Sequence, residues 1–163
     1  MQEEFPVEDL SAADPVIDAV LRASRALVAV AARSLAQAAV DVTLPQYRAL
    51  VLLAAGGPQG VADLANALRV NPSTATRMCD RLVSKRLVRR RTVPGDRRQV
   101  SLNLTETGRT LVASVSEARR GEIAEIVGAI PAGRRSQVIG ALDAFSAAAG
   151  ELAEEDWAAG WLL

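Results

Sequence analysis

The sequence predicts a mainly α-helical fold with one small β-hairpin. Half of the 163 residues are hydrophobic, alanine is abundant and only 3% are aromatic, a composition that favours closely packed helices over a β-sandwich. Most of the chain repeats apolar residues at helical spacing, whereas residues 99–104 alternate apolar and polar side chains as a half-buried strand does. A chain of this length forms one domain, or one domain with an attached dimerisation part.

Two helices are expected in the first third of the chain, after a loosely held arm of residues 1–13. Asp14-Pro15 supplies an N-cap and a first-turn residue for a long helix that reaches about Val40. Leu44-Pro45 opens a second helix, and the glycine-rich residues 56–60 end it as a loop.

A pair of short helices follows. Residues 61–68 place Val61, Leu64, Ala65 and Leu68 at helical spacing, and two residues later Asn71-Pro72 forms a second cap and first turn. This next helix runs to about Lys85. Two helices joined by so short a turn are typical of a helix-turn-helix.

The second helix of this pair has one apolar and one polar face. Its apolar arc holds Ala75, Met78, Cys79 and Leu82, which we expect in the core. Small hydroxyls followed by arginine on the other face suit a helix that enters a DNA major groove, although an ordinary helix with a solvated face is the alternative for this stretch alone. The residues expected to contact DNA here are Asn71, Ser73, Thr74, Thr76, Arg77 and Arg81.

A β-hairpin is predicted directly after this helix. Residues 87–93 and 99–104 form its strands, and Pro94-Gly95-Asp96 is a turn signal between them. Paired arginines at the tip of a hairpin are typical of a wing that probes a narrow minor groove. The wing and backbone contacts are therefore assigned to Arg69, Arg89, Arg91, Asp96, Arg97 and Arg98.

The charge of the chain is unevenly distributed. Overall the protein is neutral, with 19 basic and 19 acidic residues, but residues 69–98 contain ten basic and only two acidic residues. This segment carries a net charge of +8, so the remainder carries −8. Such a concentration of positive charge predicts a polyanionic partner, and arginine suits bidentate contacts to phosphate and guanine.

Long helices are expected again after the hairpin. Thr105 caps one that reaches about Ile130, and Pro131 starts the last. Their apolar faces suit packing against a second copy of the chain, with completion of a monomeric core as the alternative. The tail contains Trp157 and Trp161, which indicates burial, whereas its acidic residues argue against a membrane anchor.

Enzymatic chemistry has little support in the sequence. The chain has no histidine and one cysteine, which excludes imidazole catalysis, a Ser-His triad and a cysteine cluster for zinc. No glycine-rich phosphate loop is present, so no cofactor and no metal are expected. Cys79 is interpreted as a buried hydrophobic residue rather than a redox switch. With neither a signal peptide nor a membrane span in view, the expected location is the cytoplasm.

Several of these runs resemble the MarR family of bacterial transcriptional regulators. One departure from the family pattern is Arg86, which stands where the family usually has glycine, at a helix end that often requires positive φ. The matching positions are residues 64–65, 70–74, 76–77, 80–82, 87–88, 96–98 and 104–108.

The resemblance implies a homodimeric repressor on a palindromic DNA site, released by a small aromatic or amphipathic ligand. Residues 41–104 would form a winged helix-turn-helix, and residues 14–40 and 105–163 the helical dimerisation region. Arg25, Tyr47 and Arg48 are the candidate ligand contacts. The alternative is a winged-helix module that binds RNA or a protein without sequence-specific contacts to DNA.

Overall fold

The computed structural model describes residues 14–93 and 96–150, and the side chains of residues 93–99 lie outside this description. The mainly helical fold with one antiparallel hairpin is confirmed. In chain order the elements are α1 (Pro15–Ala36), α2 (Leu44–Gly56), α3 (Val61–Leu68), α4 (Pro72–Ser84), β1 (Val88–Val93), β2 (Asp96–Leu104), α5 (Glu106–Gly128), the short 3-10 helix η1 (Ala132–Arg134) and α6 (Arg135–Ala148).

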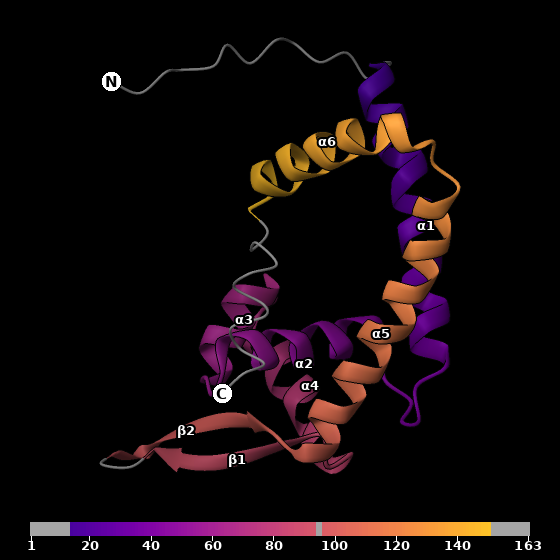
Figure 1. Cartoon of the computed structure of the whole chain (residues 1–163). Coiled ribbons are helices and arrows are strands. Elements are labelled where there is room, and N and C mark those ends of the chain that lie inside the picture. Colours follow the sequence, from indigo (N-terminus) through magenta and orange to yellow (C-terminus); the bar gives the residue numbers. More distant parts are fainter. Residues whose placement is uncertain (1–13, 94–95, 151–163) are drawn as a thin grey trace, which may run out of the picture.

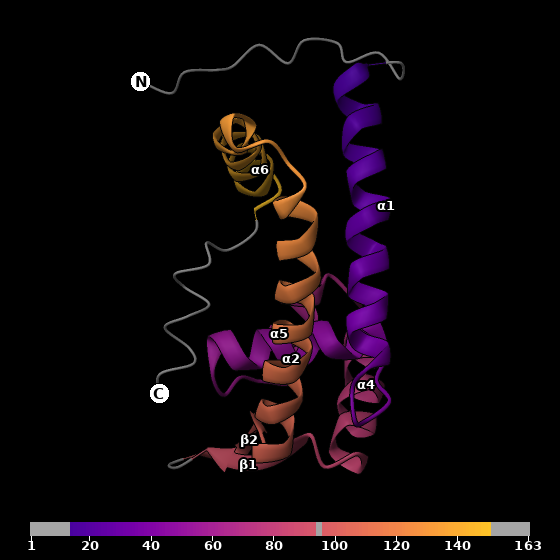
Figure 2. The same cartoon turned by 45° about the vertical axis from the view of Figure 1, so that its right-hand side comes forward.

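The elements separate into two parts (Figures 1 and 2). Helices α2, α3 and α4 pack together above the β1–β2 hairpin. Helices α1 and α5 run side by side away from this group, and α6 projects from the far end of α5. The winged helix-turn-helix therefore lies at one end of the described chain and the long helices at the other.

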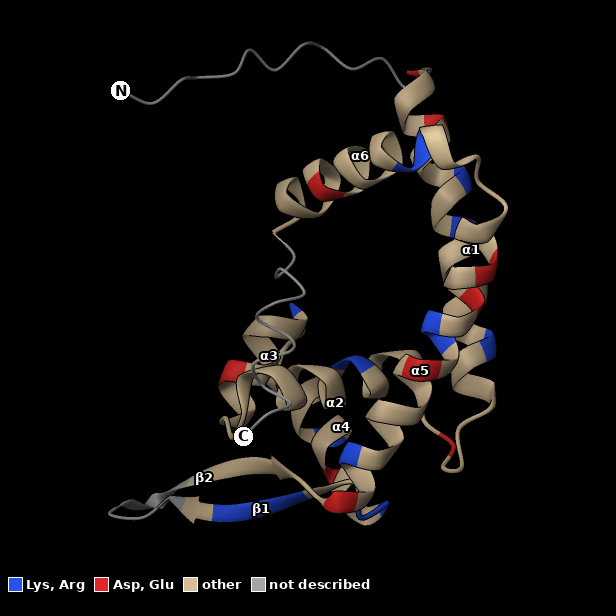
Figure 3. Ribbon diagram, viewed as in Figure 1, with Lys and Arg blue, Asp and Glu red and all other residues tan. Residues whose placement is uncertain are grey.

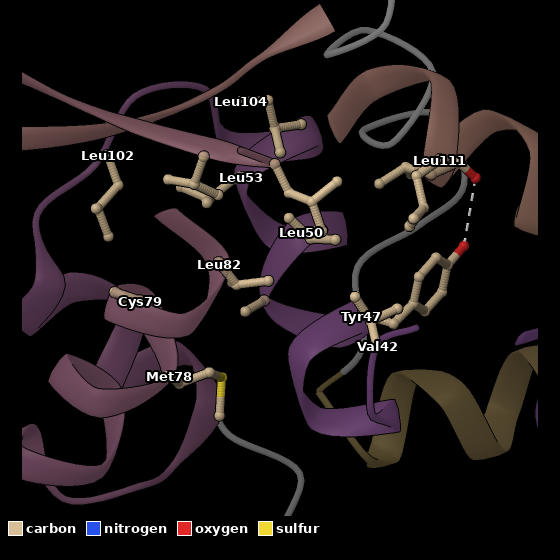
Figure 4. Close-up of a cluster of buried hydrophobic side chains, with 14 of the residues drawn as sticks. Val42, Tyr47, Leu50, Leu53, Met78, Cys79, Leu82, Leu102, Leu104 and Leu111 are labelled. Atoms are coloured by element: carbon tan, nitrogen blue, oxygen red, sulfur yellow. Dashed lines mark hydrogen bonds between the residues drawn. The ribbon is translucent and has the colours of Figure 1, made fainter. Parts of the chain in front are cut away.

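The hydrophobic core lies within the winged part (Figure 4). It is built from one face of α2, the inner faces of α3 and α4, the hairpin and the first turns of α5. Leu50, Leu64, Leu82, Leu87 and Leu102 are fully buried. Each such side chain contributes about 1.5–3 kcal/mol through burial, so this cluster is the main source of stability. The predicted core face of α4 (Ala75, Met78, Cys79 and Leu82) is confirmed.

The hairpin is antiparallel, with Val88 opposite Leu104 and Arg90 opposite Leu102. Gln59, in the loop before α3, forms a short additional bridge to β2: its backbone N–H donates to Leu102 O at 3.3 Å and its carbonyl accepts from Leu102 N–H at 2.8 Å. A single paired residue leaves no periodic signal in the sequence, and this bridge was not predicted. It fastens the hairpin to the helical layer.

Helix α1 ends at Ala36, four residues before the predicted end at Val40. The chain has to leave the helix there because Val42 is buried in the core and Thr43 must be extended to cap α2. Thr43 and Gln46 form a reciprocal capping box at the start of α2. β-branched residues between the two helices also lower helix propensity.

The last helix begins at Arg135 rather than at Pro131, which caps the short η1 turn instead. Helix α5 likewise ends at Gly128, two residues before the predicted end. The Arg135 guanidinium donates to Ile130 O at 3.1 Å and to Gly128 O at 3.3 Å. These bonds satisfy carbonyls that the end of a helix leaves unpaired, so the turn between α5 and α6 is a defined corner.

Both predicted caps of the long helices are confirmed. Asp14 Oδ1 accepts from Val16 N–H at 2.7 Å, and Thr105 Oγ1 accepts from Gly108 N–H at 3.0 Å. Within residues 14–93 and 96–150, no helix combines the length and apolarity needed to cross a lipid bilayer.

Candidate nucleic-acid interface

The first turn of α4 is fixed by Asn71. Its Oδ1 accepts from Thr74 N–H at 2.9 Å and from the Ser73 hydroxyl at 2.8 Å. The cap and Pro72 start the helix at the position predicted from the sequence. Because the Asn71 carboxamide oxygen already accepts two bonds, this residue holds the first turn in place.

The turn between α3 and α4 depends on a strained residue. Arg69 adopts the left-handed conformation, with φ 54°, and the following Val70 N–H donates to Ala65 O at 3.0 Å. For a residue with a Cβ this conformation costs about 1–2 kcal/mol. Because this position holds arginine rather than glycine, the sequence predicted a short turn here but not its left-handed conformation.

The outer face of α4 carries the predicted contact residues. Ser73, Thr76, Arg77 and Arg81 are exposed, and Thr74 is half-buried. The Thr76 hydroxyl donates to Pro72 O at 2.9 Å, while the residue stays exposed. Small side chains at the start and arginines further along would allow close approach to a duplex and contact with base edges or phosphates.

The two faces of β1 separate its three arginines. Val88 points into the core, so Arg90 shares its face, while Arg89 and Arg91 point to the outer side of the hairpin. Figure 3 shows the resulting basic stretch along β1. The sequence assigned Arg89 and Arg91 to the interface, and the strand places both on one exposed face.

Arg90, which the sequence analysis did not single out, lies beside α4. Its Nη2 donates to Asp80 Oδ1 at 2.7 Å, joining the wing to the helix. No sequence pattern marks two residues ten apart on a helix and a strand as partners. The pair becomes visible only once the turn between α4 and β1 is in place.

The predicted hairpin tip differs from the structure. Asp96, Arg97 and Arg98 belong to β2, which begins at Asp96 rather than at Gln99, and Val93 pairs with Asp96 across an irregular register. Charged residues interrupt the apolar alternation at positions 96–98, so the sequence pattern predicted a turn there instead of a strand. The side chains of these three residues lie outside the described part of the chain.

The root of the wing is held from two sides. Arg86 has φ 58°, which confirms that the helix end requires positive φ despite the absence of glycine. The Thr105 hydroxyl lies 2.7 Å from Arg86 O and 3.1 Å from Leu87 O. Gly108 packs against the Leu87 backbone, where a Cβ atom would clash. The start of α5 therefore fixes where β1 leaves α4.

Of the three candidate ligand contacts, one is buried and two are exposed. Tyr47 is buried, and its hydroxyl lies 3.0 Å from Ser116 Oγ and 3.5 Å from Val112 O on α5. The Arg119 guanidinium lies 5.4 Å from the Tyr47 ring centroid. Arg48 is exposed on α2, and Arg25 is exposed on α1. The structure thus adds Arg119 and Ser116 to the surroundings of Tyr47.

Surface depressions border the winged part, and arginines of α4 line one of them. Two open depressions border the winged part, one of about 250 Å³ beside the first turns of α5 and one of about 370 Å³ between the start of α2 and α4. Arg77 and Arg81 line the second depression. Among the residues described, no three histidine, cysteine or carboxylate side chains gather as a metal site would require.

Cys79 is buried in the core behind the outer face of α4. Burial raises the pKa of its thiol above the ordinary value, and the neighbouring Asp80 adds to this, while Arg90 and a backbone hydrogen bond act in the opposite direction. A protonated, covered thiol is a poor nucleophile. This environment agrees with the interpretation of Cys79 as a core residue.

The comparisons with known proteins agree with this geometry. The model of the MarR family matches residues 42–100. The solved structure of RV1404 from Mycobacterium tuberculosis is similar along its whole length, with 44% identity, a TM-score of 0.81 and coverage of 88% of this chain and 98% of that one.

Two curated relatives match a shorter stretch. The HTH-type transcriptional repressor NicR of Pseudomonas putida is 33% identical over 100 residues, which cover 61% of this chain and 63% of that protein. The uncharacterised HTH-type transcriptional regulator YhbI of Bacillus subtilis is 36% identical over 83 residues, which cover 50% and 54%. The chain thus spans between half and two thirds of the length of these relatives, which are named as regulators of transcription.

Proposed function

This chain belongs to the MarR family, and we propose that it is a transcriptional repressor that binds a specific site in double-stranded DNA as a homodimer. The observation that carries the proposal is the outer face of α4, where Arg77 and Arg81 are exposed beside small hydroxyl side chains. A helix-turn-helix with such a face is suited to reading a major groove.

The two parts of the interface have different roles in this proposal. Helix α4 reads base edges through Ser73, Thr74, Thr76, Arg77 and Arg81, while Asn71 fixes its first turn. The wing and the turn before α4 contact the DNA backbone and the adjacent minor groove, which attracts positive charge. The residues assigned to these contacts are Arg69, Arg89, Arg91, Asp96, Arg97 and Arg98.

A second copy of the chain would complete the long helices. Helix α6 has no buried residue, and Ile139, Leu142 and Phe145 on it are 60%, 49% and 53% exposed. Leu27 on α1 and Ile126 on α5 are also half-exposed. Apolar surface of this extent is costly in water, and a two-fold partner would cover it. We therefore assign dimerisation to residues 14–40 and 105–163, and DNA binding to residues 41–104.

We further propose that a small aromatic or amphipathic ligand releases the repressor from DNA in the cytoplasm. Its site would lie where α2 meets α5, near Tyr47 and Arg48, with Arg25 contributed by α1. Lys85 at the end of α4 donates to the carbonyl of Asp41 between α1 and α2. This contact would carry a shift of the long helices to α4, so that the ligand changes the separation of the two reading helices.

The deciding experiment is selection of bound duplexes from a random pool by the purified full chain. We expect a near-palindrome with half-sites about one helical turn apart, because two-fold related α4 helices must enter successive major grooves. A steep salt dependence shared by all duplexes, with no preferred site, would instead favour the winged-helix module that binds RNA or an acidic protein surface.

A further inference from the structure

An acidic residue lies on the face of α4 that is proposed to meet DNA. Asp80 is exposed between Arg77 and Arg81, and a carboxylate there repels phosphates. Yet Asp80 does not face solvent alone, because its Oδ1 accepts a bond of 2.7 Å from Arg90 Nη2 on β1. Both side chains remain about half-exposed, at 54% and 41%. Exposed ion pairs add little to stability, so its contribution to folding does not explain this contact.

The covalent connection between α4 and β1 is short. Lys85, Arg86 and Leu87 link the two elements, and Arg86 is held at positive φ. Thr105 fixes the carbonyls of Arg86 and Leu87 at the root of the wing. Further along the hairpin, the Gln59 bridge holds Leu102 on β2 to the loop before α3, but it does not join the hairpin to α4.

The Asp80–Arg90 pair makes that connection to α4. Arg90 is three residues beyond the root, on the core-facing side of β1, and Asp80 is more than one helical turn before the end of α4. In the described part of the chain, this is the side-chain ion pair that joins α4 to β1. The root and this pair are two points at which β1 is attached to α4, while the Gln59 bridge holds β2 to the loop before α3, so the pair is what relates the direction of the wing to α4 itself.

We propose that Asp80 and Arg90 form a strut that fixes the angle between α4 and the wing and thereby sets the selectivity of the protein for DNA sequence. This inference rests on the proposed function. When the angle is fixed, the wing reaches its groove only if α4 is seated correctly in the neighbouring one. When it is free, the wing binds phosphates whether or not α4 finds its bases, and binding to unrelated DNA gains relative to the specific site. Asp80 and Arg90 are positioning residues in this account.

The test compares two probes: a duplex selected from a random pool by the wild-type chain, and a scrambled duplex of equal length and composition. Asp80→Asn and Arg90→Gln should each lower the ratio of the two affinities, on the order of tenfold. Their effects on the scrambled duplex should be opposite, because the first variant removes a negative charge and the second a positive one. The swapped variant Asp80→Arg/Arg90→Asp keeps the net charge and should recover most of the ratio.

Glu106→Gln is the matched control, since Glu106 also forms an ion pair near the root of the wing, with Arg109 at 3.0 Å, but within α5. It should leave the ratio unchanged. Thermal unfolding of each variant shows that the compared proteins are folded. If Arg90→Gln is not folded, Asp80→Asn and the swapped variant carry the test, and Arg90→Lys, which keeps a positive donor for Asp80, should retain most of the ratio. Equal shifts for both probes in Asp80→Asn and Arg90→Gln would overturn the strut, leaving only a charge effect. Failure of the wild type to select any duplex would instead contradict the proposed function.

Discussion

Between α2 and β2 nearly every large apolar side chain is at least partly covered, whereas on α6 no residue is buried and Ile139, Leu142 and Phe145 are about half-exposed. The winged part completes its core with its own residues and the first turns of α5. In the long helices, α1 buries only Val30 and Ser34, and the buried residues of α5 all lie in its first turns. The winged part therefore covers its apolar side chains within one subunit, whereas the long helices do not.

The difference indicates what kind of partner would suit each region. The winged part presents exposed arginines over a closed core, so its unsatisfied surface is electrostatic and suits a polyanion. The long helices present leucine, isoleucine and phenylalanine, so their unsatisfied surface is apolar and suits a copy of itself. Substitutions that act on one surface should leave the other intact.

The largest effect is expected from Leu142→Glu on α6. Because Leu142 is 49% exposed, the subunit should fold with little loss of stability, but a carboxylate in a dimer interface has no partner. Separation of the subunits should reduce DNA affinity by roughly a hundredfold or more, since each half-site would then bind alone. Sedimentation with and without a cognate duplex measures both changes.

Gln137→Glu is the control, because it adds the same charge to an exposed polar position of α6. It should leave the dimer and its DNA affinity unchanged. A monomeric wild type that binds a half-site at full affinity would remove the distinction between the two regions.

The next effect comes from one substitution made in both regions. Gly108→Ala places a Cβ atom against the Leu87 backbone and 3.1 Å from Leu104 Cδ2, and should lower the free energy of unfolding by about 3 kcal/mol. Gly140→Ala on α6 meets no atom within 4 Å, and should raise it by about 0.5–1 kcal/mol through helix propensity. Denaturant unfolding of both variants gives the comparison, and similar losses at the two sites would show that α6 is as tightly enclosed as the winged part.

The features that the sequence predicted are those that depend on residues close together along the chain. The caps at Asn71 and Thr105 and the core face of α4 were predictable, because each depends on residues close in sequence. The positive φ at Arg86 was expected only from the family resemblance, which places a glycine at that position. The strand start at Asp96 was missed because pairing by the backbone needs no apolar alternation.

Contacts between distant residues were beyond the sequence. The Gln59 bridge to Leu102 and the Asp80–Arg90 pair involve residues brought together only by the folded turns. The apolar face of α6 was predicted as a face, but its exposure within one subunit depends on where the corner after α5 directs the helix.

Smaller effects should distinguish the reading of base edges by α4 from the binding of phosphates by the wing. Arg77→Ala should relax the preference at one base pair, at a cost of about 1–3 kcal/mol, because it removes a contact to a base edge. Arg97→Ala should weaken all duplexes alike and reduce the slope of log affinity against log salt by about one, because it removes a phosphate contact. Titrations at two salt concentrations with matched and mismatched duplexes distinguish them. Unchanged affinity for Arg97→Ala would remove the wing from the interface.

The smallest effect is expected from Cys79→Ser, which tests whether the winged part is as closed as its core indicates. A hydroxyl in this apolar site should cost about 1 kcal/mol of unfolding free energy and leave DNA binding unchanged. Because burial raises the pKa of the folded thiol, only the unfolded chain releases its proton as pH passes the ordinary value of 9.0. The stability contributed by the protonated thiol is thus complete below that pH and lost as pH rises towards the raised value, so the wild type should lose more stability there than the variant. Stability curves of the two proteins at pH 8 and pH 10 measure this difference. Loss of DNA binding on mild peroxide treatment of the wild type, absent in the variant, would show instead that the thiol is reachable and that the core behind α4 opens.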